Sequence, residues 1–461
     1  MLKQRVERVH FVGIGGSGMC GIAEVLLTLG YRVSGSDLKG GEVTDRLKVR
    51  GAEVRIGHAA ANVEGAQVVV YSSAVSPENP ELVEARRRGI PLIRRAEMLA
   101  ELMRLKYGVA IAGTHGKTST TGMVGLILAE GGLDPTVIIG GRLNSMGGNA
   151  RAGSGEYLVA EADESDASFL CLTPVLAVIT NVDDDHLDHY RSLDRLHAAF
   201  VEFAQRVPFY GTVVACLDDP GVRQVIPRIT RRVVTYGLLP GATLSAADIR
   251  ISAEGSSCRV RLEGRELGEL SLKAPGRHVL LNALAAVGIG LELEVPFGKA
   301  AKALAGYEGV ARRLQPKGTA GGVRVYDDYG HHPTEIRATL SAARLIAGGG
   351  RLLVLFQPHR FTRTNLLRDA FGSAFEAADE AVITDIYPAG EQPIPGVDGS
   401  LVAGAVERNG RPAVRYVQDL AAAAEAVAAA ARRGDLVVTL GAGDVSRQAE
   451  RILQLLARRG A

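Results

Sequence analysis

The chain contains a glycine-rich turn whose residues could hold the phosphates of a nucleotide. Gly113-Thr114-His115-Gly116-Lys117-Thr118 follows the apolar run 109–112 and precedes a segment with helical spacing of apolar residues. The pattern predicts a strand, a tight turn and the start of a helix. Such a turn can bind an anion through backbone N–H groups, the positive end of the helix and the Lys117 ammonium, and the Thr118 hydroxyl could bind Mg²⁺. Ile111 stands at the first glycine position of the longer GxxxxGK[ST] pattern, so the motif is the shorter GTxGKT form. We predict a nucleotide-phosphate site here rather than a plain turn.

Two groups of acidic residues follow apolar runs in the same region. The first is EADESD at 161–166, which begins with Glu161 after the run 157–160. The second is DDDHLDH at 183–189, which contains His186 and follows the run 175–180. Carboxylates at two adjacent strand ends would suit two Mg²⁺ ions that bridge ATP phosphates and a substrate oxygen. The alternatives are a solvated charged face and, for His186, a helix cap.

A second glycine-rich turn lies near the N-terminus, at 13–19, with the sequence GIGGSGM. It follows the apolar run 9–12 and precedes a helical pattern, and the next predicted strand, 31–36, ends in Asp37. A third strand, 67–70, leads into Ser72 and Ser73. This order predicts a Rossmann-like unit that binds a diphosphate on its glycines and a ribose or base at Asp37. The glycine pattern alone suits NAD, FAD, a UDP-sugar or a purely structural turn.

The C-terminal third repeats the alternation of strands and helices. Its predicted strands 323–326 and 351–356 end in polar loops, DDYGHHP at 327–333 and QPHRFTRT at 357–364, and the second loop carries His359, Arg360 and Arg363. A further strand, 436–440, runs into GAGD at 441–444, which would either bind a nucleotide or form a turn. With the Ala-rich helix near 420–432, these elements predict a second Rossmann-like sheet.

The elements that position these residues divide the chain into three α/β domains, in agreement with the length of 461 residues. We predict a nucleotide-binding Rossmann-like domain at 1–107, a central P-loop ATPase-like domain at 108–310 and a C-terminal Rossmann-like domain at 311–461. Shorter alternating strands between 212 and 273 predict a small antiparallel part of the central domain. A glycine-rich loop is expected at 147–149.

The composition is that of a globular enzyme of the cytoplasm. Basic and acidic residues nearly balance, 53 against 51, which argues against nucleic acid as the main partner. The four cysteines show no CxxC spacing, so buried thiols in a reducing compartment are expected rather than disulfides or a zinc site. No apolar stretch approaches the roughly 20 residues of a membrane span, and the N-terminus lacks a signal-peptide pattern.

The phosphate loop at 113–118, the two acidic groups and the basic loop at 357–364 together predict ATP-dependent activation of an anionic substrate. Phosphoryl transfer needs positioning and charge neutralisation more than covalent help from the protein. These residues leave the acceptor open, because a hydroxyl acceptor would need a nearby base whereas a carboxylate would give an acyl phosphate directly.

Six segments, in order along nearly the whole chain, resemble the Mur ligase family. They are GIGGSGM at 13–19, GTHGKT at 113–118, EADESDASF at 161–169, TNVDDDHLDHY at 180–190, DDYGHHPTE at 327–335 and HRFTRT at 359–364. The resemblance implies a monomeric or homodimeric cytoplasmic enzyme with ATP and Mg²⁺ that joins L-alanine to the carboxylate of UDP-N-acetylmuramate through an acyl phosphate. Members that add later amino acids carry a carbamylated lysine after the DH motif, whereas this chain has no lysine between Lys117 and Lys273.

Two alternatives are kept beside this interpretation. A recycling ligase would join an intact tripeptide to the same UDP-sugar, and only the third domain would distinguish it. A regulator that binds a nucleotide sugar without catalysis is a different class of protein, and the presence of Lys117, Glu161 and His186 argues against it.

The resemblance also implies roles for individual residues. Those expected to be catalytic are Lys117, Glu161, His186, His331 and Arg360. Those expected at ATP are Gly113, Thr114, His115, Gly116, Lys117, Thr118, Ser119, Asn282, Arg313 and Asp328, and the expected metal ligands are Thr118, Glu161 and His186. Those expected at the other substrates are Gly15, Gly16, Ser17, Gly18, Met19, Asp37, Ser72, Ser73, His359, Arg360 and Arg363. Val279 stands where the family often has Asn, which leaves the adenine contact to Asn282 and backbone groups.

Overall fold

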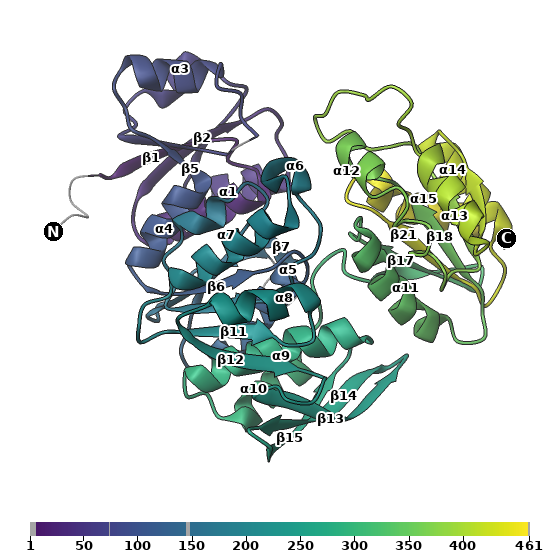
Figure 1. Cartoon of the computed structure of the whole chain (residues 1–461). Helices are drawn as coiled ribbons and strands as arrows, with labels where there is room; N and C mark the ends of the chain where they lie inside the picture. Colours follow the sequence, from purple (N-terminus) through teal and green to yellow (C-terminus); the bar gives the residue numbers. More distant parts are fainter. Residues whose placement is uncertain (1–5, 73, 144–147, 460–461) are drawn as a thin grey trace. The chain divides into compact units, whose positions relative to one another are not determined.

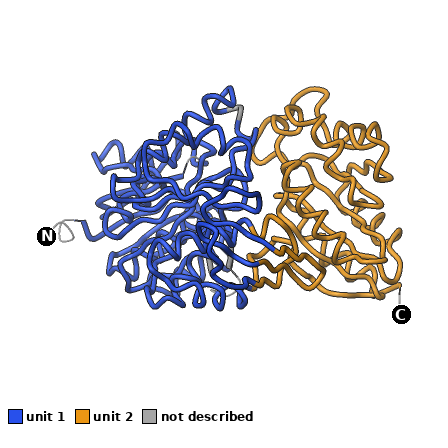
Figure 2. Tube along the Cα trace, turned by 60° about the horizontal axis from the view of Figure 1, so that its bottom comes forward, with its two compact units in different colours: residues 1–247, 259–270, 281–307 blue, residues 248–258, 271–280, 308–461 orange. Residues whose placement is uncertain are grey.

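The computed structural model describes residues 6–72, 74–143 and 148–459, which form three α/β sheets (Figure 1). The chain separates into two compact units (Figure 2). The first unit contains residues 1–247, 259–270 and 281–307, and the second contains 248–258, 271–280 and 308–461. The expected domain limits at 107 and 310 stay a prediction, because these units do not test them.

The first sheet has five parallel strands in the order β3-β2-β1-β4-β5, which confirms the predicted Rossmann-like start. Neighbouring parallel strands must be joined by crossover connections, and most of these connections contain a helix. The order reverses at β1, so the loop after β1 lies at the point where such sheets bind ligands. The strands are β1 (Arg8–Val12), β2 (Arg32–Asp37), β3 (Glu53–Ile56), β4 (Val68–Tyr71) and β5 (Leu92–Arg94). The helices are α1 (Ser17–Thr28), α2 (Glu42–Val49), η2 (Ala60–Val63), α3 (Pro80–Arg87) and α4 (Arg95–Arg104).

The second sheet has ten strands in the order β15-β14-β13-β12-β11-β10-β6-β9-β7-β8. Its strands are β6 (Tyr107–Ala112), β7 (Thr136–Leu143), β8 (Gly148–Arg151), β9 (Tyr157–Glu161), β10 (Leu176–Ile179), β11 (Thr212–Cys216), β12 (Arg232–Gly237), β13 (Leu244–Ser252), β14 (Gly255–Leu262) and β15 (Arg265–Leu272). Its helices are α5 (Lys117–Glu130), η4 (Ser168–Cys171), α6 (Leu187–Tyr190), α7 (Leu193–Gln205), α8 (Pro220–Val225), η5 (Ile226–Arg228), α9 (Arg277–Glu292) and α10 (Phe297–Ala305). The strand before the phosphate loop, β6, has β9 and β10 as parallel neighbours.

Three expectations about this sheet were wrong in detail. The antiparallel part does not begin at 212, because α7 and α8 act as crossovers and keep β11 and β12 parallel to β10. Hairpins begin only after β13, where the turns 253–254 and 263–264 are too short for parallel connections. The predicted loop at 147–149 is strand β8 from Gly148 onward, and Gly147 lies outside the described residues. The two acidic groups do not follow adjacent strands, since β9 and β10 lie on either side of β6.

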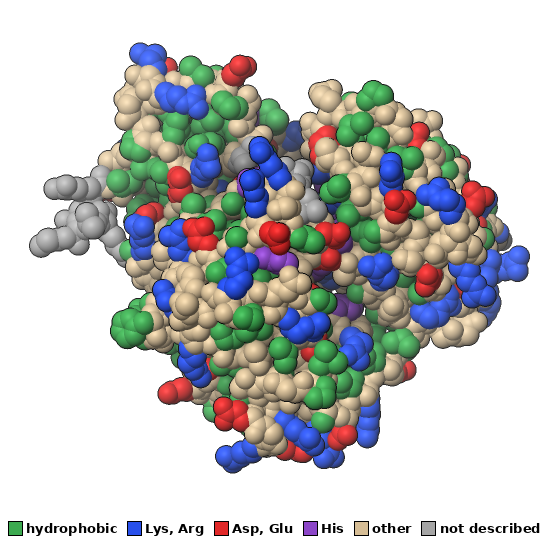
Figure 3. Space-filling view, in the orientation of Figure 1, with side chains coloured by type: hydrophobic (Ala, Val, Ile, Leu, Met, Phe, Trp, Pro, Cys, Tyr) green, Lys and Arg blue, Asp and Glu red, His purple; other side chains and the backbone are tan. Residues whose placement is uncertain are grey.

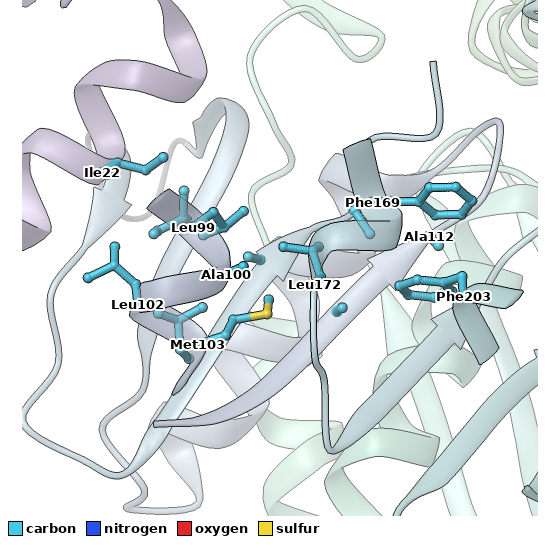
Figure 4. Close-up of a cluster of buried hydrophobic side chains, with 14 of the residues drawn as sticks. Ile22, Leu99, Ala100, Leu102, Met103, Ala112, Phe169, Leu172 and Phe203 are labelled. Carbon is cyan, nitrogen blue, oxygen red and sulfur yellow. The ribbon is translucent and has the colours of Figure 1, made fainter. Parts of the chain in front are cut away.

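One hydrophobic core joins the first two sheets within the first unit. Figure 4 shows Ile22 of α1 and Leu102 of α4 in the same cluster as Phe169 and Phe203 beside the second sheet. The Phe169 and Phe203 rings stack with centroids 5.0 Å apart. The elements that carry the glycine loops after β1 and β6 therefore share one packed core.

The third sheet has the order β16-β17-β21-β18-β19-β20, with only β16 antiparallel to its neighbour, which confirms the second Rossmann-like sheet. Alternate β18 residues enter two cores, Leu352 and Val354 on one face and Leu353 and Leu355 on the other. The strands are β16 (Gln315–Ala320), β17 (Val323–Asp328), β18 (Leu352–Phe356), β19 (Glu380–Ile383), β20 (Ala413–Tyr416) and β21 (Leu436–Leu440). The helices are α11 (Pro333–Ala347), α12 (Phe361–Leu366), α13 (Ser400–Asn409), α14 (Leu420–Ala430), η6 (Asp444–Arg447) and α15 (Gln448–Arg459).

The surface agrees with the balanced composition. On the face shown in Figure 3, basic and acidic side chains are interspersed rather than gathered by sign. Among the described residues, none of the helices combines the length and the apolar character needed to cross a membrane.

Candidate active site

The turn between β6 and α5 has the backbone geometry of a phosphate loop. Gly113 has φ 135° and Gly116 has φ 82°, backbone angles that residues with a side chain rarely adopt. A Cβ on Gly113 would lie 1.9 Å from Thr180 Oγ1, and a Cβ on Gly116 would lie 2.6 Å from Asn282 Oδ1. Both positions therefore require glycine, for conformation and for space.

The segment that follows β10 fixes the shape of this loop. Asn181 accepts a hydrogen bond from the His115 backbone N–H at 2.7 Å and donates its amide to the His115 carbonyl at 3.1 Å. The Thr180 hydroxyl also donates to the His115 carbonyl, at 2.7 Å. Asp183 pairs with the His115 ring at 3.0 Å, and its backbone N–H donates to the Thr114 hydroxyl. The second acidic group thus begins with residues that hold the loop.

Lys117 lies inside the loop with its ammonium bound on several sides. Its Nζ donates to the carbonyls of Gly113 at 2.6 Å and Thr114 at 3.1 Å. It also pairs with the buried carboxylate of Glu164 at 2.8 Å. Burial lowers the Lys117 pKa, but Glu164, Asp163 and the nearby carboxylates raise it more, so the ammonium stays charged.

Glu161 and Glu164 are the acids closest to the loop. Glu161 ends β9 opposite Ile111 of β6, and its carboxylate accepts hydrogen bonds from the Gly140 N–H at 2.7 Å and from the Thr118 hydroxyl. Burial raises the Glu161 pKa. Burial also raises the Glu164 pKa, to about 7, against the opposing effect of Lys117. Glu164 lies in the acidic segment predicted at 161–166 but was not singled out, although its place three residues after Glu161 was a usable signal.

His186 joins the same group. Its Nε2 lies 3.6 Å from Glu164 Oε1 and 3.6 Å from Asp185 Oδ2. The residue has φ 59° and its carbonyl accepts from the N–H groups of His189 and Tyr190 at the start of α6. The backbone therefore caps a helical turn while the ring faces the carboxylates, so the cap and the site are compatible.

In the first sheet, the glycine loop is tied to Asp37. The Gly15 N–H donates to Asp37 Oδ2 at 2.9 Å, and Gly16 caps α1. Arg95, which was not predicted, lies so close to Gly18 that a Cβ there would be 2.5 Å from its Nη1. Arg95 also donates to Asp163 at 3.0 Å. It connects the glycine loop of the first sheet to the acidic segment of the second.

The remaining predicted residues of the first sheet differ in their placement. The Met19 side chain is buried in the core and its N–H donates to the Gly16 carbonyl, so it packs the start of α1, and its place at a substrate stays a prediction. Ser72 is half-buried after β4. Ser73 and the side chain of Ser17 lie outside what the structure describes.

Near the phosphate loop, Asn282 on α9 is buried beside Gly116, and Ser119 is half-buried in the first turn of α5. In the second unit, Asp328 is buried and accepts hydrogen bonds from Leu314 N–H at 2.6 Å and Gly330 N–H at 2.8 Å. Its carboxylate therefore shapes the loop after β17. Any contact of Asp328 with a ribose would add to those bonds.

A second polar group forms at the carboxyl ends of β17 and β18 in the second unit. Arg313 pairs with Glu335 at 3.3 Å, which also accepts from the His331 N–H at 3.1 Å. The His331 and His359 rings lie 5.5 Å apart, and Arg363 approaches His359 Nδ1 at 3.4 Å. The structure thus brings together four predicted residues from separate motifs.

Arg360 stands out by its backbone. It has φ 68° just before α12, a conformation that costs roughly 1 to 3 kcal/mol for a residue other than glycine. Its carbonyl accepts from the Thr364 hydroxyl at 2.7 Å, which helps to hold it. Such strain is typical of residues placed for function.

Comparison with known proteins decides the family. Family models match residues 8–107 (Mur ligase family, catalytic domain), 111–290 (Mur ligase middle domain) and 312–443 (Mur ligase, glutamate ligase domain). The UDP-N-acetylmuramate–L-alanine ligase of Geobacter sp. (strain M21) is 54% identical over 97% of each chain. The chain belongs to the Mur ligase family. It is thus an enzyme, a ligase of peptidoglycan synthesis.

Other Mur ligases support the same grouping. The UDP-N-acetylmuramate–L-alanine ligase of Sorangium cellulosum is 54% identical over 97% of this chain and 96% of that one. The solved UDP-N-acetylmuramate–alanine ligase of Thermotoga maritima has a TM-score of 0.82 at 30% identity over 97% of this chain and 98% of that one. A murein peptide ligase from Psychrobacter arcticus, TM-score 0.73 and 22% identical over 98% and 99% of the two chains, shares the fold.

Proposed function

We propose that this Mur ligase joins L-alanine to the carboxylate of UDP-N-acetylmuramate, with ATP converted to ADP and phosphate. The observation that carries the proposal is the intact phosphate loop, with Lys117 charged and enclosed and with Glu161, Glu164 and His186 around it. The names of two relatives that are 54% identical to this chain support the two substrates.

The residues beside the loop also fit Mg²⁺. Glu161 offers carboxylate oxygens and Thr118 a hydroxyl, which are hard oxygen donors of the kind this ion prefers. The pKa of Glu161 is raised by burial, so a cation at this place would relieve the cost of its charge. When bound, Mg²⁺ would supply positive charge at the ATP phosphates. We propose Thr118, Glu161 and His186 as the residues that hold it.

In the proposed reaction, the loop N–H groups and Lys117 hold the ATP phosphates. Lys117 exchanges its bonds to the loop carbonyls for phosphate oxygens and stabilises charge as the γ-phosphoryl group moves to the muramyl carboxylate. Asn282 and Asp328 are proposed to contact adenine and ribose, Arg313 to lie near the ATP phosphates, and the loop at Gly15 to contact the UDP diphosphate.

The product of this step is an acyl phosphate, which the neutral amine of L-alanine attacks. The C–N bond forms, the C–O bond to phosphate breaks, and the amine loses a proton. We propose that His359, Arg360 and Arg363 orient the carboxylate and the amino acid, with His331 beside them. The positive charge of Arg360 and Arg363 would stabilise the oxyanion of the tetrahedral intermediate.

Phosphate release tests the proposal and its rival. Purified protein with UDP-N-acetylmuramate, ATP and Mg²⁺ is given L-alanine, the tripeptide or neither. Release that depends on L-alanine supports the proposal, release only with tripeptide supports the recycling ligase, and the absence of release under any divalent metal would contradict both. We also propose a monomer or homodimer without a nucleic-acid partner, which sedimentation with and without nucleic acid would check.

A further inference from the structure

Tyr387, which follows β19 in the second unit, lies flat against a residue of the proposed substrate site. Its ring and the His359 ring are 5.6 Å apart between centroids and only 12° from parallel. The His331 ring also lies near His359, with 5.5 Å between centroids and a tilt of 51°. His359 is thus stacked on Tyr387 and contacts His331, while its Nδ1 meets Arg363.

Gly443 supports Tyr387 from the loop after β21. A Cβ on Gly443 would lie 2.7 Å from Tyr387 Cγ, so the absence of a side chain lets the ring approach that backbone. Gln357 anchors the same loop, since its Oε1 accepts from the Val445 N–H at 3.1 Å. The GAGD segment, for which nucleotide binding and a turn were equal alternatives, packs here as the base of a stack that continues through Tyr387 to His359.

The backbone of Tyr387 also pairs with the residues around His359. Its N–H donates to the Pro358 carbonyl at 2.9 Å, and its carbonyl accepts from the Arg360 N–H at 2.9 Å. These two bonds flank His359 and lead directly into the strained backbone of Arg360. One residue therefore fixes the ring plane of His359 and the chain direction at Arg360.

We infer that Tyr387 is a positioning residue that, with Gly443 behind it, sets His359 and Arg360 for the incoming amino acid and the muramyl carboxylate. The inference rests on the proposed function. An imidazole on a free side chain can rotate, whereas a stacked one is held near a single plane, and misplacement by about 1 Å can cost up to about 10²-fold in rate. Tyr387 itself need not touch a substrate for this role.

Ring removal is the most direct test. Tyr387→Leu is expected to lower kcat/KM for L-alanine by about 10-fold or more, with the KM for ATP within about twofold of the wild type. Tyr387→Phe keeps the ring and is expected to match the wild type. Tyr416→Leu is the matched control, because Tyr416 is another half-buried tyrosine of the same unit that packs in the core of the sheet. It should lower thermal stability without changing kcat/KM for L-alanine.

Gly443→Ala gives a second test that keeps the tyrosine. A Cβ on Gly443 would meet the tip of Gln357 at 2.5 Å and Tyr387 Cγ at 2.7 Å, so the expected loss of kcat/KM is assigned to the ring only where the His359 ring signal moves with it. Histidine ring signals in NMR spectra of the labelled full-length chain, assigned with His359→Gln, give a readout apart from turnover. The His359 signal should shift in Tyr387→Leu and Gly443→Ala and stay in place in Tyr416→Leu.

The outcomes separate this inference from the proposed function. Wild-type protein without L-alanine-dependent phosphate release would overturn the proposed function. An active wild type with Tyr387→Leu and Gly443→Ala as efficient as Tyr387→Phe would overturn only the positioning role. If Tyr387→Leu does not fold, Gly443→Ala alone decides, and an unchanged kcat/KM together with an unmoved His359 signal contradicts the inference.

Discussion

At the scale of single residues, Lys117 is the group on which we expect turnover to depend most. Its ammonium is enclosed by loop carbonyls and Glu164, with 17% of the side chain exposed. Lys117→Ala should reduce turnover by at least about 10³-fold, because phosphoryl transfer depends on charge at the phosphates. UDP-sugar binding should stay nearly intact, since it is expected at the first sheet. Phosphate release and calorimetric titration of the UDP-sugar measure the two effects.

Lys302 provides the matched control for this substitution. It is an exposed lysine of the same unit, and its ion pair with Glu130 is on the surface. Lys302→Ala should leave both turnover and binding within about twofold of the wild type. A folded Lys117→Ala protein that loses its affinity for the UDP-sugar would contradict the separation of the two sites.

The buried position and partners of Glu81 lead us to expect that the stability of the protein depends on pH. Its buried carboxylate accepts hydrogen bonds from Ser36 at 2.6 Å and Asn62 at 2.5 Å and pairs with His10. Burial alone would raise the Glu81 pKa, but these partners lower it from 4.5 to about 2. Because the folded pKa is the lower one, the stabilisation is complete above about pH 4.5 and is lost as the pH falls toward 2.

Glu81→Gln removes this titration. Between pH 4.5 and 2, the wild type should lose on the order of 2 to 3 kcal/mol more of its free energy of unfolding than the variant. Urea unfolding across that pH range, followed by circular dichroism, measures both slopes. Parallel curves for the two proteins would show that Glu81 does not titrate in this way.

At the scale of elements, the segment after β10 acts as a brace for the phosphate loop. Asn181 bonds both the N–H and the carbonyl of the half-buried His115, so Asn181→Ala removes the partner of the N–H and leaves the carbonyl with the Thr180 hydroxyl. We expect the KM for ATP to rise about 10-fold and the free energy of unfolding to fall by about 1 to 3 kcal/mol. Asn409→Ala, at an exposed asparagine that bonds only Glu376 among the described residues, is the control. Equal kinetics in both variants would contradict the bracing role.

Strand and turn patterns predicted the elements better than their connections. The apolar run before Gly113 predicted β6, and the acidic segments were correctly placed at strand ends. Their arrangement on either side of β6 could not be predicted, because strand order depends on crossovers between distant segments. The parallel pairing of β11 and β12 was missed because short alternating strands resemble an antiparallel sheet until the helices between them are counted.

At the scale of the whole molecule, the sequence predicted the three sheets and most of the named residues around the phosphate loop and at the ends of β17 and β18. Contacts between residues that are distant along the chain could not be predicted from the sequence. Glu164 was not distinguished from its acidic neighbours, and Arg95 lacked any motif, since its role follows from a packed core that places α4 beside both loops. Met19 belonged to the glycine motif but is a core residue, because helix α1 turns it inward.

The central claim is that the muramyl carboxylate takes the γ-phosphoryl group before L-alanine attacks. The most direct measurement uses UDP-N-acetylmuramate with ¹⁸O in both carboxylate oxygens, together with ATP, Mg²⁺ and L-alanine. The account predicts that one labelled oxygen appears in the released phosphate for each amide formed, because the C–O bond to phosphate breaks when the amine attacks. Amide formation with unlabelled phosphate would contradict it.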